Sequence, residues 1–295
     1  MAIKSRRAFL TGQVPTLSEW VKFQQRLAQE VGPEQLVQLP SCGQARFVPR
    51  QSGDVHGAFA LAQHFDIQLA LFTAQQVSQA EQFGAREGLL WIDPVHLNRC
   101  EVLDEQGRLY VEPGCTLGQL VAAGCEQFAP LPAALRFIEW LADPQYQQGR
   151  ALTDSGLQMA SLLLADCSVA RLGPFGVDAQ MQLNTPALRR IVPQLFQLVH
   201  TERVQRCLEL PVWPARYRLD AFVDSKEVNL AYLVLGQGLQ LGWLQWAVLD
   251  PQSLTVGTPL AAPPAQDEQT HRRVQGIERT VRELFDPGQR FLALL

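Results

Sequence analysis

The chain of 295 residues lacks several features that would assign it to a common functional class. No apolar run approaches the roughly 18 residues that a membrane-spanning helix requires. The formal net charge is −4, so the chain lacks the basic excess with which proteins bind nucleic acid. We therefore expect neither a membrane span nor a nucleic-acid partner.

Metal-binding cysteine patterns are also missing. The six cysteines form no Cys-x-x-Cys pair, and no histidine stands at metal-ligand spacing from them. This spacing does not favour a zinc or iron–sulfur site. Scattered cysteines in a chain of this length are typical of buried thiols in a reducing compartment. We predict a cytoplasmic protein without a bound metal.

Arg6 and Arg7 belong to a Ser-Arg-Arg-Ala-Phe-Leu segment that resembles a twin-arginine export motif. A working signal needs an apolar stretch directly after the arginines, whereas Thr-Gly-Gln-Val-Pro follows here. We interpret this segment as a basic arm that can dock on a partner, with a targeting role as the alternative.

The elements that are present indicate an α+β fold. Hydrophobic residues make up 47% of the chain, enough for a sizeable core. Apolar spacing and capping signals predict helices at about 16–32 (with Thr16 as N-cap), 54–65, 116–125, 133–142, 186–199 and 269–285. Strands are predicted at 45–49, 67–72, 89–93, 100–104, 109–112, 157–164, 169–172, 215–223, 228–235 and 239–249. The strands come as hairpins, and the chain contains no Gly-x-Gly-x-x-Gly, so a Rossmann sheet is not expected.

Several segments, in order along the chain, resemble the motifs of one enzyme family. They are residues 47–55 (FVPRQSGDV), 91–99 (WIDPVHLNR), 111–120 (VEPGCTLGQL), 162–166 (LLLAD) with 172–176 (LGPFG), and 283–291 (ELFDPGQRF). In this order they resemble the FAD-linked oxidases of the vanillyl-alcohol oxidase and p-cresol methylhydroxylase (PCMH) superfamily. The FAD-binding subunit of glycolate oxidase is the member that the chain resembles most.

The resemblance implies a PCMH-type FAD-binding fold with two subdomains and a truncated C-terminal cap. Residues 1–37 would form an N-terminal arm and helix, and residues 38–205 the FAD-binding domain. Residues 206–295 would form a short β-rich cap remnant and the C-terminal helix. The resemblance also implies FAD as the cofactor, with candidate binding residues at Thr73, Ala74, Gln75, Gln76, Ser78, Gly114 and Thr116.

The glycines of the family's flavin-binding loops are largely missing. Glycine lets a backbone approach a pyrophosphate closely and adopt positive φ. Where the family carries glycine-rich runs, this chain has residues 72–78 (FTAQQVS), 131–139 (LPAALRFIE) and 192–200 (VPQLFQLVH). The Thr73 and Ser78 hydroxyls and the Gln75 and Gln76 amides can donate hydrogen bonds, but their side chains also take up space beside the phosphates.

The sequence is therefore compatible with two functions. In the first, the chain binds FAD and oxidises a 2-hydroxy acid, as one subunit of an oxidoreductase complex. In the second, it is a cofactor-free pseudoenzyme with a structural or partner-binding role. No catalytic residue is predicted for either function. Arg216 and Arg218 lie two apart on a predicted strand and therefore on one side of it, which suits either a carboxylate clamp or an exposed basic edge.

Overall fold

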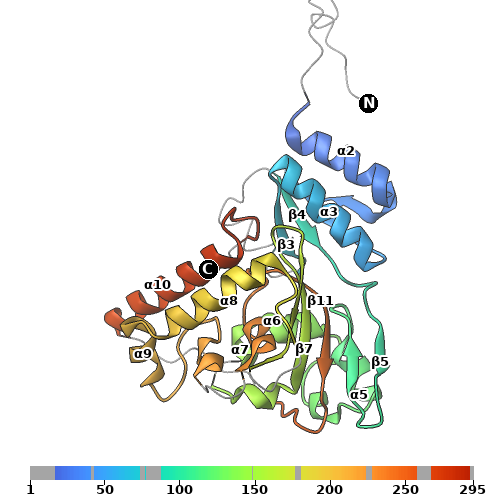
Figure 1. The fold of residues 1–295 in the computed structure, drawn as a ribbon. Helices are drawn as coiled ribbons and strands as arrows, with labels where there is room; N and C mark the ends of the chain where they lie inside the picture. The colour runs from blue at the N-terminus through green and yellow to red at the C-terminus, as the bar shows by residue number, and fades with distance from the viewer. Residues whose placement is uncertain are drawn as a thin grey trace, which may run out of the picture.

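The computed structural model describes residues 17–40, 43–73, 77, 88–147, 149–176, 181–223, 228–257 and 267–292. These residues form a four-stranded sheet near the N-terminus and a five-stranded sheet below it, with helices packed around both (Figure 1). The predicted α+β class is confirmed. None of the described helices is long and apolar enough to cross a membrane.

The four-stranded sheet is mostly parallel. Its strands follow the order β1 (Leu36–Gln38), β2 (Gln44–Phe47), β4 (Leu89–Ile92) and β3 (Gln68–Leu71). β4 runs parallel to both of its neighbours, and β1 runs antiparallel to β2. Helix α3 (Ser52–Phe65) leads from β2 to β3, so the prediction that strands come only as hairpins is wrong for this part of the chain.

Helix α2 (Glu19–Val31) lies beside α3 at the top of the molecule (Figure 1). It buries Trp20, Phe23 and Leu27. Its N-cap is Ser18, whose Oγ accepts a hydrogen bond from the backbone N–H of Val21 at 3.3 Å. The predicted cap at Thr16 is therefore wrong by two residues. Both residues are good caps, and the local sequence did not decide between them.

The second sheet is antiparallel throughout. Its strands follow the order β5 (Cys100–Val102), β6 (Leu109–Val111), β11 (Trp243–Leu249), β7 (Leu157–Leu163) and β8 (Val169–Leu172). The predicted hairpins β5–β6 and β7–β8 are confirmed. β11 lies between them and pairs with both β6 and β7. A strand from the segment predicted as a cap remnant thus completes the centre of this sheet.

The remaining helices surround the second sheet. They are α5 (Leu117–Ala122), α6 (Phe137–Ala142), α7 (Pro144–Gln147), α8 (Pro186–Val199), α9 (Glu202–Leu208) and α10 (Glu268–Phe285). Short 3-10 helices span Pro33–Gln35, Glu126–Phe128, Leu152–Ser155, Leu219–Phe222 and Leu230–Val234, and a small ladder joins β9 (Pro174–Phe175) to β10 (Val228–Asn229).

Two predicted strands are wrong. Residues 215–223 are a loop and a 3-10 helix, and residues 228–235 contain two strand residues followed by another 3-10 helix. The Asn229 side chain caps the second of these helices by accepting from the N–H of Ala231 at 2.9 Å. A short buried apolar run in a sequence does not distinguish a strand from a helical turn. Here the Asn229 cap favours the helical turn.

The C-terminal segment is bonded to the first sheet. After α10, the chain returns to β3, where the Leu69 N–H donates to Arg290 O at 2.7 Å and the Leu292 N–H donates to Leu69 O at 2.9 Å. Asp286 is buried, and its carboxylate accepts from the backbone N–H groups of Arg290 and Phe291, both at 2.9 Å. The Phe-Asp-Pro-Gly motif is therefore a turn that places Phe291 in the core.

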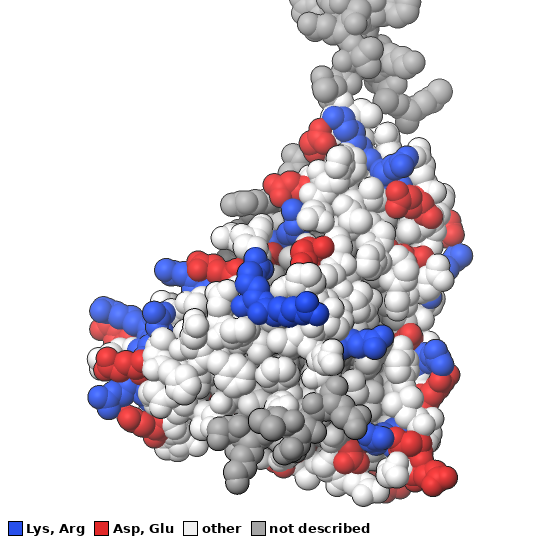
Figure 2. Space-filling view, viewed as in Figure 1, with Lys and Arg blue, Asp and Glu red and all other residues white. Residues whose placement is uncertain are grey.

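Charged side chains of both signs are interspersed over the face in Figure 2. On that face they do not gather into one broad basic or acidic patch. This distribution agrees with the small net charge of −4.

Replacing Asp286 with alanine tests the role of the C-terminal turn. Asp286→Ala leaves two backbone N–H groups without their acceptor, so we expect a loss of about 1–3 kcal/mol in the free energy of unfolding. Glu283→Ala is the matched control, because Glu283 is exposed on the same segment. Urea denaturation measures both variants, and equal effects would contradict the assigned role.

Thiol reactivity tests the buried cysteines. Burial raises the pKa of Cys115 and of Cys125 from 9.0 to about 12. The reactive thiolate is therefore rare near pH 8, and we expect both thiols to react with a thiol reagent only after unfolding. The half-buried Cys100 and Cys167 should react faster in the native protein. Mass spectrometry of time-resolved labelling gives the order, and fast labelling of Cys125 would contradict this burial.

Candidate functional site

The predicted cofactor residues fall in two places. Thr73 follows β3 and lines a cavity of about 440 Å³, here called the β3 cavity. Gly114 and Thr116 lie at the start of α5, on the side of the second sheet. Ala74, Gln75, Gln76 and Ser78 are outside the described residues.

Gly114 has no room for a side chain. A Cβ atom at this position would lie 1.8 Å from the carbonyl oxygen of Pro94 and 2.8 Å from that of Leu97. The Gly114 N–H also donates to Leu97 O at 2.7 Å. Packing within the protein is thus sufficient to require this glycine, and the space above its Cα is already filled.

The backbone at the start of α5 is bonded to the chain itself. The N–H groups of Leu117 and Gly118 donate to Leu135 O at 2.8 Å and Ala133 O at 3.0 Å. In the other direction, Phe137 N–H donates to Cys115 O at 2.7 Å. We call these bonds, together with the bond from the Ile138 N–H to Pro113 O at 3.2 Å, the 113–138 clamp.

Thr116 is the N-cap of α5. Its Oγ1 accepts from the Gln119 N–H at 3.2 Å, and its own N–H donates to Gln119 Oε1 at 2.8 Å. This reciprocal pair is a capping box. Together with the 113–138 clamp, it leaves the first turn of α5 without an unbonded backbone donor for a phosphate.

A buried carboxylate with two arginines lies at the carboxyl end of β4. Asp93 is fully buried and forms ion pairs with Arg46 of β2 and with Arg136, whose Nη1 lies 2.6 Å from Asp93 Oδ1. The Arg46 guanidinium also lies over the Phe72 ring, 4.4 Å from its centroid. Sequence reasoning missed this cluster, although Asp93 belongs to a motif segment. No local pattern pairs three residues this far apart.

The β3 cavity opens between β3 and the loop before β11. Apolar side chains of Leu71, Leu135 and Leu239 contribute to its wall. Its charged side chains are Glu139, Asp143 and Arg216. Its volume of about 440 Å³ falls within the usual range for a small-molecule pocket.

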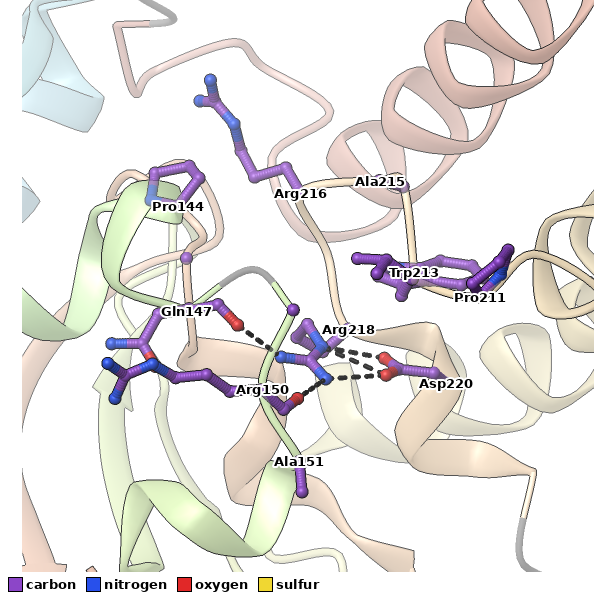
Figure 3. Close-up of a pocket in the computed structure, with 13 residues that line it drawn as sticks. Pro144, Gln147, Arg150, Ala151, Pro211, Trp213, Ala215, Arg216, Arg218 and Asp220 are labelled. Carbon is purple, nitrogen blue, oxygen red and sulfur yellow. Dashed lines mark hydrogen bonds and ion pairs between the residues drawn. The ribbon is translucent and has the colours of Figure 1, made fainter. Parts of the chain in front are cut away.

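A second cavity of about 260 Å³ adjoins it and shares Pro144 and Arg216 with it (Figure 3). Arg218 lines this cavity, is buried, and pairs with Asp220 at 2.7 Å. Arg218 also donates to the carbonyl oxygens of Gln147 at 2.9 Å and Arg150 at 3.1 Å. Its donors are thus used within the protein.

Arg216 and Arg218 therefore form neither a clamp nor an exposed basic edge. They do not lie on a strand, and Figure 3 shows Arg216 extending away from the Arg218–Asp220 pair. The prediction that placed both arginines on one side of a strand is wrong, because this segment is held as a loop by Arg218.

The space between the two sheets is filled by apolar side chains. Leu69 of the first sheet, Trp243 of the second, and Leu239 and Phe291 line a residual cavity of only about 10 Å³. These residues belong to one continuous hydrophobic core.

The described residues do not fit an FAD held as the resemblance implies. Gly114 and the start of α5 are closed by the protein's own carbonyl groups, and Thr116 is engaged in a capping box. No group of three or more His, Cys, Asp or Glu side chains is placed to hold a metal within the part of the chain that the structure describes.

Comparison with known proteins gives similarity only at the level of solved structures. No family model matches the chain, and no curated protein matches it. Alkyldihydroxyacetonephosphate synthase is similar at 12% identity and a TM-score of 0.47, over 85% of this chain and 42% of that one. Chitooligosaccharide oxidase (10% identity, TM-score 0.45) covers 79% of this chain and 43% of its own.

A third similar structure is 6-hydroxy-D-nicotine oxidase from Arthrobacter nicotinovorans, at 12% identity and a TM-score of 0.41. It covers 81% of this chain and 41% of its own length. The chain thus spans less than half the length of each of these three proteins.

Replacing Gly114 with alanine tests whether packing alone demands this glycine. The new Cβ would clash with backbone rather than with a movable side chain, so we expect a loss of about 3 kcal/mol in unfolding free energy. Gly53→Ala is the control, because a Cβ there meets only the Gln51 side chain at 3.9 Å. If urea denaturation of the flavin-free protein shows no difference between the two variants, the packing role is refuted.

Proposed function

We propose that this protein is a cofactor-free relative of the FAD-linked oxidases that acts as a partner-binding subunit of an oxidoreductase complex. The 113–138 clamp is the observation that carries the proposal. It bonds the backbone N–H groups beside the candidate residues Gly114 and Thr116 to the protein's own carbonyl groups, so these donors are not available to a flavin phosphate.

Two further observations support the loss of FAD. The segment that replaces one glycine run, residues 131–139, supplies the fully buried Phe137 and Ile138 to the core. The contact region between the sheets is packed around Leu239 and Trp243. A flavin at either place would require displacing buried apolar side chains, each worth about 1.5–3 kcal/mol of burial.

A second candidate keeps the flavin. Arg46 and Arg136 bring two positive charges to one carboxylate at the strand ends near Phe72, which leaves one net positive charge there. This favours an anion such as a cofactor phosphate beside that edge. In this version the chain is the FAD-binding subunit of a 2-hydroxy-acid oxidase resembling glycolate oxidase, with Thr73, Ala74, Gln75, Gln76 and Ser78 at the phosphates.

The remaining assignments belong to the same proposal. We infer a cytoplasmic location, supported by the five described cysteines, which are all free thiols. We also retain the division into an N-terminal arm and helix (1–37), a PCMH-type domain (38–205) and a C-terminal part (206–295), with β11 of the last part inserted into the second sheet. The basic arm around Arg6 and Arg7 is a candidate contact with the partner.

Flavin binding by the isolated chain decides between the two candidates. We expect purified protein without flavin absorption, and no change in melting temperature when FAD is added, because a ligand that binds only the native state must raise that temperature. In the host cell, the tagged chain should co-purify with a separate polypeptide that carries the flavin.

Two results would contradict the cofactor-free proposal. Flavin bound in stoichiometric amount to the isolated chain, and released in Thr73→Ala, would refute the cofactor-free proposal and support the second candidate. A complex whose only flavin stays on this chain would do the same.

A further inference from the structure

The β3 cavity contains charges of both signs that do not pair with one another. Arg216, Glu139 and Asp143 all line it. None of the ion pairs among the described residues joins Arg216 to either carboxylate. The cavity therefore presents a cation and two anions at separate positions on its wall.

The Arg216 guanidinium forms no ion pair among the described residues, although its backbone is anchored. Its backbone N–H donates to the Glu278 carboxylate at 2.8 Å, which fixes the start of the side chain. Its Nη1 lies close to Gly238, where a Cβ atom would come within 2.9 Å of it. Within the described part of the chain, no acceptor binds the guanidinium, so its planar set of donors is available to a ligand.

In both Glu139 and Asp143, one carboxylate oxygen accepts a hydrogen bond from a backbone N–H, and the other oxygen accepts none among the described residues. Glu139 Oε2 accepts from the Arg136 N–H at 3.1 Å, and Asp143 Oδ1 accepts from the Gln145 N–H at 2.8 Å. These bonds orient the two side chains. Among the described residues, nothing donates to the second oxygen of either one, so each retains capacity for an ammonium group.

We propose that the β3 cavity binds a zwitterionic α-amino acid with an apolar side chain. The guanidinium of Arg216 matches a carboxylate, and the carboxylates of Asp143 and Glu139 match an ammonium group. Leu71, Leu135 and Leu239 supply an apolar wall for the side chain. A simple carboxylic acid would face two like charges, and a simple amine would face Arg216.

This inference goes beyond the proposed function and is independent of it. The cavity walls belong to described residues, and none of the contacts above requires a flavin. If the chain is a cofactor-free partner subunit, binding of an amino acid at this site would make that subunit responsive to a ligand.

Calorimetric titration of the FAD-free protein with L-leucine tests the proposal. Its two half-ligands, 4-methylpentanoate and isopentylamine, each keep the apolar group and one charge. We expect L-leucine to bind, and both half-ligands to bind about tenfold or more weakly, since each loses a charged hydrogen-bonded contact.

Variants that remove one charge each assign the contacts. Arg216→Gln should weaken L-leucine about tenfold or more and leave isopentylamine unchanged or tighter, because its repulsion is removed. Asp143→Asn should weaken L-leucine while keeping the acceptor for Gln145. Arg171→Gln is the control, since Arg171 is exposed and is not among the described residues that line the cavity, and it should bind as the parent does. Circular dichroism establishes that each variant is folded.

The proposal is overturned if L-leucine does not bind with a Kd below about 10 mM. It is also overturned if either half-ligand binds as tightly as L-leucine, or if Arg171→Gln weakens binding as much as Arg216→Gln. A parallel titration with FAD separates this failure from that of the proposed function. FAD binding without leucine binding refutes both, and leucine binding together with FAD binding refutes only the cofactor-free proposal.

Discussion

The 113–138 clamp is the constraint on which the rest of the site depends. Its four backbone hydrogen bonds hold residues 133–138 against the start of α5. They also fix Arg136, which reaches the buried Asp93 at the end of β4, and Asp93 in turn binds Arg46 of β2. Through Arg136 and Asp93, the clamp beside the second sheet is thus linked to strands β2 and β4 of the first sheet. Losing the clamp would leave Asp93 with one arginine fewer in a buried position, which is costly for an ion pair.

The sequence allowed the locally encoded parts of the fold to be predicted. The hairpins β5–β6 and β7–β8 have their turn signals within a few residues, and helix α8 occupies Pro186–Val199 as predicted. Strand pairing between distant segments could not be predicted in the same way. The position of β11 between β6 and β7 depends on partners at least 80 residues earlier in the chain, and hydrophobic alternation does not encode which strands will pair.

The same limit applies to the candidate site. Thr116 was predicted both as the N-cap of this helix and as a cofactor-binding residue; the cap is confirmed, and the cofactor role stays a prediction. Arg218 was read as part of a strand, whereas its hydrogen bonds to the carbonyl oxygens of Gln147 and Arg150 hold a loop. Those acceptors are backbone atoms, which every residue carries, so no sequence pattern marks them. The Arg46–Asp93–Arg136 cluster was missed because each member lies on a different element.

Residues 131–139, which contain no glycine, contribute large apolar side chains to the core. Phe137 and Ile138 of the clamp and the following Trp140 are fully buried, and Trp140 packs edge-on against Phe128 with ring centroids 4.8 Å apart. Large apolar side chains at these positions stabilise the fold, whereas glycine would add backbone freedom to the unfolded chain and remove packing. Single glycine substitutions here would not free the backbone donors of α5, because the N–H groups of Gly118 and Leu117 would still be bonded to Ala133 and Leu135. This segment is part of the core, whereas the charged side chains that form no ion pair with one another line the β3 cavity.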